Sequence, residues 1–281
     1  MISPLLPLLT SALFAFSVRT PTGEIILSNV PLGSIYSLET HARQSYRLQN
    51  TSDAPIDASI TIAVPNKKDH LVSGYEPLPN ADWVRVTQER ARLAPAEEIK
   101  TDLLFKVPMD AKYSGKKFQA FVWAKSAPSG QTTTISAGLK SRLLINLAST
   151  TSRKTESITT SPESIKLENF PKGNQIDLRE KYETFAFTNT TAKTVFMHLT
   201  ALPANASFAK ITEKTSIGNT DWLTLPGKIY RVKPNQTFEF PIKIKIPTNA
   251  VKDTYAFAIE SIVTGLGEPI VSLSDLCIST N

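Results

Sequence analysis

Residues 238–246 read Phe-Glu-Phe-Pro-Ile-Lys-Ile-Lys-Ile, and this stretch decides the fold class. Apolar side chains at every second position alternate with charged side chains or proline. Because successive side chains of a β-strand point to opposite faces, a period of two predicts a strand with one buried and one wet face. Proline cannot donate to a strand ladder, so Pro247 is expected to close this strand. No helical periodicity of similar length occurs, and the pattern allows no more helix than a short turn around residues 89–92.

The same pattern occurs earlier in the chain. Leu103, Phe105 and Val107 alternate with polar residues up to Pro108, and Asp102 and Lys106 are expected to face outward. At a constant offset of 139 residues, Asn50-Thr51, Asp82-Trp83, Pro95 and Pro108 recur as Asn189-Thr190, Asp221-Trp222, Pro234 and Pro247. Further upstream, residues 29–33 correspond to residues 169–173 at an offset of 140. Two copies of one unit predict two domains of one fold.

The repeat divides the chain of 281 residues. We expect a first β-sandwich domain at residues 22–148, a Ser/Thr-rich linker at 149–161 and a second β-sandwich domain at 162–281. Each unit shows about seven short alternating runs separated by turn residues, a spacing typical of a β-sandwich. A tryptophan at the same place in both copies is expected to be a packing residue of the fold.

The turns carry a resemblance to a known group of proteins. The motifs are the Asn50–Pro55 turn, Leu93-Ala94-Pro95 and the Tyr113-Ser114-Gly115 approach to the last hairpin. Together they resemble the immunoglobulin-like modules of bacterial surface and periplasmic proteins, a broad group that includes PapD-like and major-sperm-protein-like domains. The resemblance covers nearly all of residues 22–281, and the second unit departs from it at Ala192-Lys193 and at residues 249–254. It implies an all-β chain of two tandem immunoglobulin-like β-sandwich domains, and it specifies function poorly.

The front of the chain resembles a secretory signal. Residues 2–17 are apolar and free of charge, and Ala15-Phe16-Ser17 could serve as a cleavage site before Val18. Against this, no Lys or Arg precedes the run, and Pro4 and Pro7 interrupt it; an ordinary first strand or a misassigned start is the alternative. We therefore expect residues 1–17 to be a signal peptide and the protein to be extracytoplasmic, either periplasmic or secreted to the cell surface. No apolar run is long enough for an integral membrane span.

Net charge and cysteine content limit the kinds of partner and covalent link that we expect. The net charge of +6 comes from basic residues interleaved with acidic ones, whereas nucleic-acid binders concentrate them on one face, so we expect no nucleic-acid partner. The single cysteine, Cys277, excludes an internal disulfide. It is expected to fill space in the last strand, with a free thiol for an intermolecular bridge as the alternative.

The chain shows no catalytic motif. His41, His70 and His198 are scattered, and nucleophile-elbow, P-loop, dinucleotide-binding and metalloprotease motifs are absent from the sequence. We therefore predict no catalytic residue, no cofactor, no metal and no enzyme activity. Asn50, Asn189, Asn205 and Asn235 stand in Asn-x-Ser/Thr sequons, which we interpret as turn chemistry.

Two loops differ most between the copies, at residues 66–80 and 124–138. Loops on a rigid sandwich commonly carry binding, so Tyr75, Glu76, Leu78 and Trp123 are the candidate partner-binding residues. Solvent-exposed loops without a function are an equally good explanation.

Residues 139–147 offer an alternating edge strand with Leu143, Ile145 and Leu147. The leading hypothesis is a non-catalytic, exported binding or structural protein whose partner is a protein or an envelope component. The alternative is a PapD-like assembly chaperone, which the resemblance implies would donate an edge strand to a subunit. A carbohydrate-active enzyme is the third hypothesis. Exposed strand edges also leave a homo-oligomer open.

Overall fold

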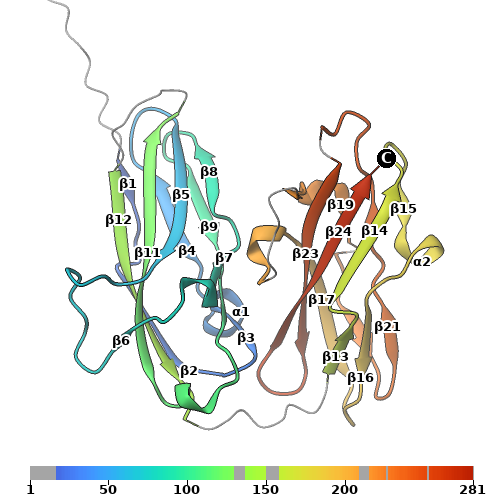
Figure 1. Cartoon of the computed structure of the whole chain (residues 1–281), viewed down its shortest axis with the longest axis horizontal. Coiled ribbons are helices and arrows are strands. Elements are labelled where there is room, and N and C mark those ends of the chain that lie inside the picture. Colours follow the sequence, from blue (N-terminus) through green and yellow to red (C-terminus); the bar gives the residue numbers. More distant parts are fainter. Residues whose placement is uncertain are drawn as a thin grey trace, which may run out of the picture.

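The computed structural model describes residues 17–129, 137–149, 158–208, 215–225, 227–251 and 253–280. The chain is all-β, as predicted, and Figure 1 shows two lobes, one coloured blue to green and the other yellow to red. Apart from Ser17, the predicted signal peptide lies outside the described residues, as does most of the predicted linker. No helix in the described part of the chain is long and apolar enough to cross a membrane.

The first lobe is a sandwich of β-sheets. One layer has the order β2 (Glu24–Val30), β12 (Ala137–Leu147), β11 (Lys117–Pro128), β5 (Ile56–Ala63) and β8 (Arg90–Leu93), with β6 (Glu76–Pro77) added beside β11. The facing strands are β1 (Val18–Arg19), β4 (Tyr46–Asn50) and β9 (Glu98–Thr101), then β3 (Ile35–Ser37), β10 (Leu103–Lys106) and β7 (Val84–Val86). Their inward side chains form one apolar core.

The second lobe has its own apolar core. Its longest strands are β17 (Val195–Pro203), β23 (Thr254–Thr264) and β24 (Ile270–Thr280), joined by β14 (Ser164–Phe170), β20 (Tyr230–Val232) and β18 (Ser216–Ile217). The other short strands are β13 (Ile158–Ser161), β16 (Ala186–Asn189), β21 (Thr237–Glu239), β15 (Ile176–Asp177), β22 (Lys243–Ile244) and β19 (Leu223–Thr224). The domain boundaries and the duplication itself stay predictions.

The apolar residues at every second position are buried in residues 103–107 and 240–246, but neither run is one continuous strand. Phe240, Ile242, Ile244 and Ile246 are fully buried. The chain nevertheless changes sheet between β21, which pairs with β16, and β22, which pairs with β15 and β19. In the first lobe the change falls at Asp102, between β9 and β10. Pro241 stands at the change in the second lobe and cannot donate to either ladder.

One buried asparagine organises a turn in each lobe. Nδ2 of Asn50 donates to the carbonyls of Ala54, Leu93 and Ala94 at 2.9–3.1 Å. Nδ2 of Asn189 donates to the carbonyls of Lys193 and Val232 at 2.8 and 3.1 Å. Each Oδ1 accepts from the backbone and hydroxyl of the residue two positions on, Ser52 or Thr191. These two sequons are therefore turn devices, because both side chains are fully buried.

The tryptophans pack in similar ways. Each ends a 3-10 turn, η1 (Ala81–Trp83) in the first lobe and η4 (Thr220–Trp222) in the second. Trp83 meets Phe118 edge to face at 5.9 Å, and Trp222 meets Phe257 at 6.4 Å. Two further 3-10 turns are η2 (Ala111–Tyr113) and η3 (Ala204–Ala206). The expectation of a packing role for both tryptophans agrees with these contacts.

The predicted turn around residues 89–92 is wrong, since residues 90–92 belong to β8. The helices lie elsewhere, as α1 (Leu38–Ala42) and α2 (Leu178–Lys181). Ser37 caps α1 by accepting from the Thr40 amide, and Asp177 caps α2 by accepting from the Arg179 amide. One or two turns are too short to show a helical period, so only these caps could have indicated them.

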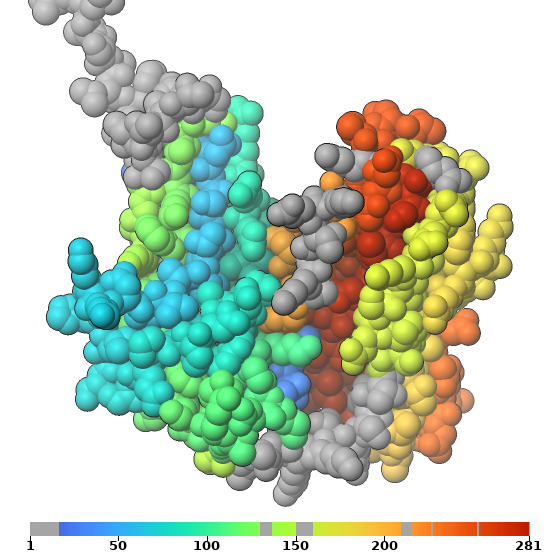
Figure 2. All heavy atoms as spheres, in the orientation of Figure 1, coloured from blue at the N-terminus to red at the C-terminus, as the bar shows by residue number. Residues whose placement is uncertain are grey.

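The lobes pack against one another through outer sheet faces. Val271 of β24 pairs with Ile35 of β3, so one sheet of nine strands runs through both lobes. Ile35, Leu104 and Val271 form a small buried cluster there, covered by Leu202, Phe208, Ile262 and Leu273. His41 Nε2 lies 3.0 Å from the Pro269 carbonyl, and Arg85 Nε donates to the Ser207 carbonyl at 3.2 Å. Figure 2 shows the lobes separating beyond this junction.

Candidate functional site: a pocket at the junction of the lobes

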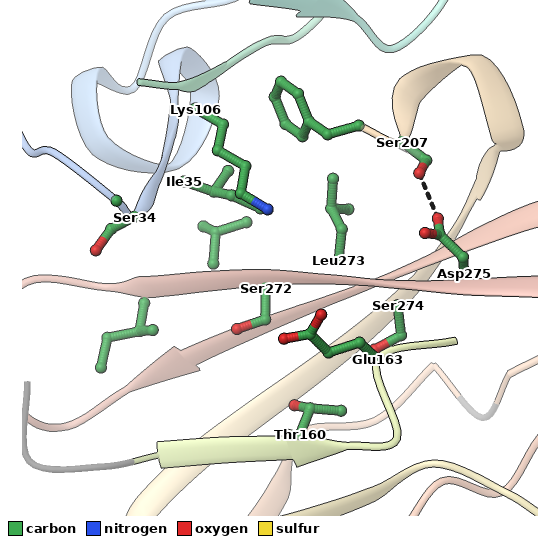
Figure 3. Close-up of a pocket in the computed structure, with 14 residues that line it drawn as sticks. Ser34, Ile35, Lys106, Thr160, Glu163, Ser207, Ser272, Leu273, Ser274 and Asp275 are labelled. Carbon is green, nitrogen blue, oxygen red and sulfur yellow. Dashed lines mark hydrogen bonds between the residues drawn. The ribbon is translucent and has the colours of Figure 1, made fainter. Parts of the chain in front are cut away.

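A pocket of about 520 Å³ lies where the two lobes meet (Figure 3). One wall comes from the start of β3 and the end of β10 in the first lobe. The other comes from β24, η3 and the segment between β13 and β14 in the second lobe. Its lining is Gly33, Ser34, Ile35, Lys106, Thr160, Glu163, Ser207, Phe208 and residues 270–275.

The edge of β24 is uncovered where it borders this pocket. On that side β24 pairs with β3 only at Val271 and with β14 only from Asp275 onward. The Asp275 amide donates to the Glu163 carbonyl, so alternate residues of β24 point their backbone groups to this side. Leu273 lies between the two paired residues, and within the described part of the chain its N–H and C=O have no partner on this side. A short edge with a free donor and a free acceptor therefore borders the pocket.

Among the residues that the structure describes, Lys106 is the cation that lines this pocket. The Lys106 side chain is exposed and points into the pocket (Figure 3), and its Nζ lies 5.8 Å from the centre of the Phe208 ring. Alternation on β10 explains the direction: Leu103 and Phe105 enter the core, so Lys106 leaves from the opposite face. The outward orientation predicted for Lys106 agrees with this, although it faces the other lobe and not open solvent alone.

Two carboxylates share the pocket with Lys106. Ser207 Oγ hydrogen-bonds Asp275 Oδ1 in a very close contact. Burial raises the pKa of Asp275, and the Ser207 hydroxyl and the Lys106 charge act in the opposite direction. Glu163 is exposed at the rim, and the buried Thr160 hydroxyl has no hydrogen-bond partner among the described residues. The site can therefore offer backbone hydrogen bonds, the hydroxyls of lining serines such as Ser272 and the Lys106 ammonium group to a ligand.

Of the four predicted loop residues, Tyr75 and Glu76 lie near the first residues of β11. The Tyr75 hydroxyl donates to Asn146 Oδ1 at 2.8 Å, and the Glu76 carboxylate pairs with Lys116 Nζ at 3.0 Å. Both side chains remain at least partly exposed. The structure leaves their predicted role in binding untested.

The other two loop residues have different environments. Leu78 is 1% exposed and belongs to the first core, so it cannot meet a partner and its prediction as a binding residue is wrong. Trp123 is half-buried on the outer face of β11, with Lys125 Nζ 4.0 Å and Lys140 Nζ 5.2 Å from its ring centre. Glu76 stands beside Phe118 in the register, five residues from Trp123, which is about 17 Å along a strand. The four residues therefore do not form one site, and residues 130–136 of the second predicted loop lie outside the described residues.

The predicted edge strand, β12, has a neighbouring strand on each side and is therefore an interior strand. Leu143 and Ile145 of β12 pair with β11 on one side and with the parallel strand β2 on the other. Leu147 pairs with β2 and donates its amide to the Lys116 carbonyl. Their side chains are 0–5% exposed in the first core. The prediction that they form an edge is wrong, because residues 24–30 lie alongside them. Alternation identifies an inward face and says nothing about which strands are neighbours.

The residues that line the pocket include none of the predicted site residues. The sequence pattern predicts only that Lys106 faces outward, and it gives no prediction for the edge of β24. A signal was present in Val271-Ser272-Leu273-Ser274-Asp275, where small polar residues interrupt an otherwise apolar last strand. Cys277 does lie in this last strand; it is a free thiol, half-buried, and burial raises its pKa.

No family model matches the chain. A search of curated proteins also gave no match. Among solved structures, a PapD-like domain of human CEP192 is similar over 53% of this chain and 97% of its own, at 13% identity and a TM-score of 0.35. The E. coli chaperone DraB is similar over 92% and 98%, at 14% identity and a TM-score of 0.32. The CsuC–CsuE chaperone–tip subunit complex of Acinetobacter baumannii matches over 95% and 100%, at 12% identity and a TM-score of 0.31.

One of these structures is described as a PapD-like domain, the group that the turn motifs resemble, and this chain is likewise all-β. The TM-scores are low and the identities are far below those of close relatives. The function therefore has to be inferred from this chain's own geometry.

Proposed function

We propose that this protein binds an extended segment of another protein in the pocket between its lobes, as a chaperone-like binding protein. The observation that carries this proposal is the uncovered edge of β24 at Leu273. An extended peptide presents alternating N–H and C=O groups, and adding it as a strand would satisfy the free backbone groups of that edge. This favours the chaperone hypothesis over a general structural role.

The pocket also sets a preference for charge. Lys106 projects over the same edge and would pair with a carboxylate of the bound segment, which is a charge-assisted hydrogen bond. Glu163 and Asp275 would repel an acidic residue placed beside them, so the preference for a carboxylate applies only next to Lys106. The edge between Val271 and Asp275 accommodates only about three residues at the rise of a β-strand, so further contacts must come from the walls of the two lobes.

This proposal differs from the predicted donation of Leu143, Ile145 and Leu147 to a subunit. Those side chains already fill the first core, and β12 has a neighbour on each side. Strand addition would therefore use β24 in the second lobe. Extracytoplasmic location is part of the same proposal and is tested by fractionation of the native cell. The absence of enzyme activity stays a prediction.

The decisive variant is Leu273→Pro. Proline removes the one outward N–H, and the ladder to β23 is spared because Leu273 does not direct its N–H to that side. Leu273→Ala is the matched control, since it shortens the side chain and keeps the N–H. We expect a partner recovered in stoichiometric complex from the native cells to bind the alanine variant and to be lost from the proline variant.

A photo-crosslinking amino acid gives a second test. Placed at Ser272, it should link to the partner, and placed at Thr61 on the outer face of β5 it should not. Lys106→Met should weaken binding about tenfold if the cation pairs with a carboxylate. Equal crosslinking at Ser272 and Thr61, or full binding by Leu273→Pro, would remove the pocket from consideration.

A further inference from the structure

Glu260 is a buried carboxyl group in the contact between the lobes. It lies on β23 opposite Leu273 of β24 and Thr200 of β17, and it is 7% exposed. Phe257 and Ile259 on the same strand point into the second core. Alternate residues of β23, including Glu260 and Ile262, therefore leave by the outer face, which is covered by the first lobe. No hydrogen bond to the Glu260 carboxyl occurs among the described residues.

The charges that act on Glu260 have the same sign as its own. They are those of Asp102, at the change of sheet between β9 and β10, and of Glu39 on α1. Asp102 is itself 8% exposed, although the sequence pattern predicts that it faces solvent. It accepts from Ser37 Oγ at 2.6 Å, from the Glu39 amide at 2.8 Å and from the Leu103 amide at 2.7 Å. These donors are matched to an ionised Asp102.

Most of the other charged or titratable groups at the junction have contacts of their own. Arg85 of β7 binds Asp82 and the Ser207 carbonyl. Lys106 lies over Phe208, and Asp275 is bonded to Ser207. His41 of α1 contacts the Ser37 backbone and the Pro269 carbonyl, and His198 stands beside Ile262 on the outer face of β17. No cation is therefore paired with Glu260 in the described structure.

Burial, and then repulsion by Asp102 and Glu39, raises the pKa of Glu260 from 4.5 to about 7. Burial also raises the pKa of Asp102 from 3.8 to about 6, against the effect of its three hydrogen-bond donors. Both carboxyl groups therefore keep a proton to a higher pH than an exposed carboxyl does. A buried carboxylate without a partner is costly, so a small rise in pH changes the energy of this contact.

We propose that Glu260 is a pH-dependent switch, or catch, between the lobes. Its protonated form allows the lobes to pack together, and its ionised form favours their separation. When the lobes separate, Glu260 meets water and its pKa returns toward the ordinary value of 4.5. The packed arrangement therefore binds more protons, and it is favoured at low pH and weakened as the pH rises from about 4.5 to about 7. Each unit of difference in pKa is a factor of ten, so the packing equilibrium changes by at most about 300-fold.

The test is small-angle X-ray scattering of the full chain between pH 5 and pH 8. We expect the wild-type radius of gyration to increase with pH and the Glu260→Gln variant to stay compact at both pH values. Glu168→Gln is the matched control: Glu168 is exposed on β14, so this variant should follow the wild type. A wild-type radius that does not change, or a Glu260→Gln variant that still expands, would overturn the proposal.

A second measurement is made on the wild-type protein, and the variant serves only to assign the signal. Carbon-13 NMR of labelled wild-type protein follows the titration of each glutamate carboxyl. We expect one carboxyl, absent from the spectrum of Glu260→Gln, to titrate with a midpoint near 7. If every glutamate titrates between about 4 and 5, the catch does not exist, whether or not a protein segment binds in the pocket.

Discussion

The two lobes are alike inside and different on the faces that meet. Asn50 and Asn189 make corresponding hydrogen bonds to corresponding backbone carbonyls, and Trp83 and Trp222 each meet a phenylalanine edge to face. At the change of sheet, in contrast, Asp102 in the first lobe stands where Pro241 stands in the second. The two interiors are thus packed in the same way. The lobes differ in the residues on the faces that meet, and our two proposals concern residues at that junction.

The largest expected difference concerns the tryptophans. Trp83 is 8% exposed, whereas Trp222 is only half-buried. Trp83→Ala should lower the free energy of unfolding by about 4 kcal/mol, and Trp222→Ala by about 2 kcal/mol, because a larger cavity costs more. Urea denaturation measures both. If Trp222→Ala lowered the free energy of unfolding more than Trp83→Ala, the difference in burial would not explain the difference between the lobes.

Loss of the buried asparagine should lower the free energy of unfolding by a similar amount in the two lobes. Asn50→Ala and Asn189→Ala each leave two or more buried carbonyls without a donor, so we expect each to cost about 3 kcal/mol. Asn66→Ala is the control, because Asn66 caps an exposed turn, and it should cost under about 1 kcal/mol. The same denaturation curves would break the comparison if only one of the buried asparagines mattered.

The junction should make stability depend on pH. The raised pKa values of Glu260, about 7, and Asp102, about 6, mean that the folded chain holds protons that the unfolded chain releases. Stability is therefore fully present below about pH 4 and declines as the pH rises to about 7, by at most about 3 kcal/mol from Glu260 alone. Thermal unfolding of the wild type at pH 5 and pH 8 should show this decline. Glu260→Gln should remove most of it, and an unchanged pH dependence would contradict the assignment.

Substitution of the residue at the change of sheet should cost more stability in the first lobe than in the second. Asp102→Ala frees one hydroxyl and two backbone amides from their acceptor, and we expect a loss of about 2 kcal/mol at pH 7. Pro241→Ala mainly increases the entropy of the unfolded chain and should cost about 1 kcal/mol. Equal losses, measured by denaturation, would mean that Asp102 has no role beyond that of a strand breaker.

The smallest effects on stability are expected at the exposed loop of the first lobe. Glu76→Ala breaks one surface ion pair and should change stability by under about 0.5 kcal/mol. If Tyr75 and Trp123 bind a partner, as the sequence predicts, their alanine variants should lose binding while the melting temperature changes little. Loss of stability in these variants, as expected for Leu78→Ala, would make them packing residues.

Sequence alone predicts the interior of this protein well. The alternation in residues 238–246 and 103–107 correctly identifies the side chains that enter each core, and the Asn-Thr turns fall where strands end. A period of two cannot show which strand lies beside which, and so β12 was taken for an edge. It also cannot tell solvent from a second lobe, and for this reason Asp102, which is buried at the junction, was predicted to face water.

The pocket was missed for a related reason. Its properties arise from Leu273 and Lys106, which are 167 positions apart in the sequence and belong to different lobes. A free backbone edge has no signature in side-chain pattern, since any residue has an N–H except proline. That edge is uncovered because β14 starts beside Asp275 and β3 starts beside Val271, and both starts are set by the fold.

The buried amides of Asn50 and Asn189 have a practical consequence for producing this protein. Both stand in sequons that a eukaryotic secretory host recognises, and such hosts attach glycans while the chain is still unfolded. A sugar on either Nδ2 would occupy the nitrogen that must donate to carbonyls in the interior. Yeast or mammalian expression should thus deliver a chain that is glycosylated and unable to close its turns, whereas a host without that enzyme should deliver the folded protein.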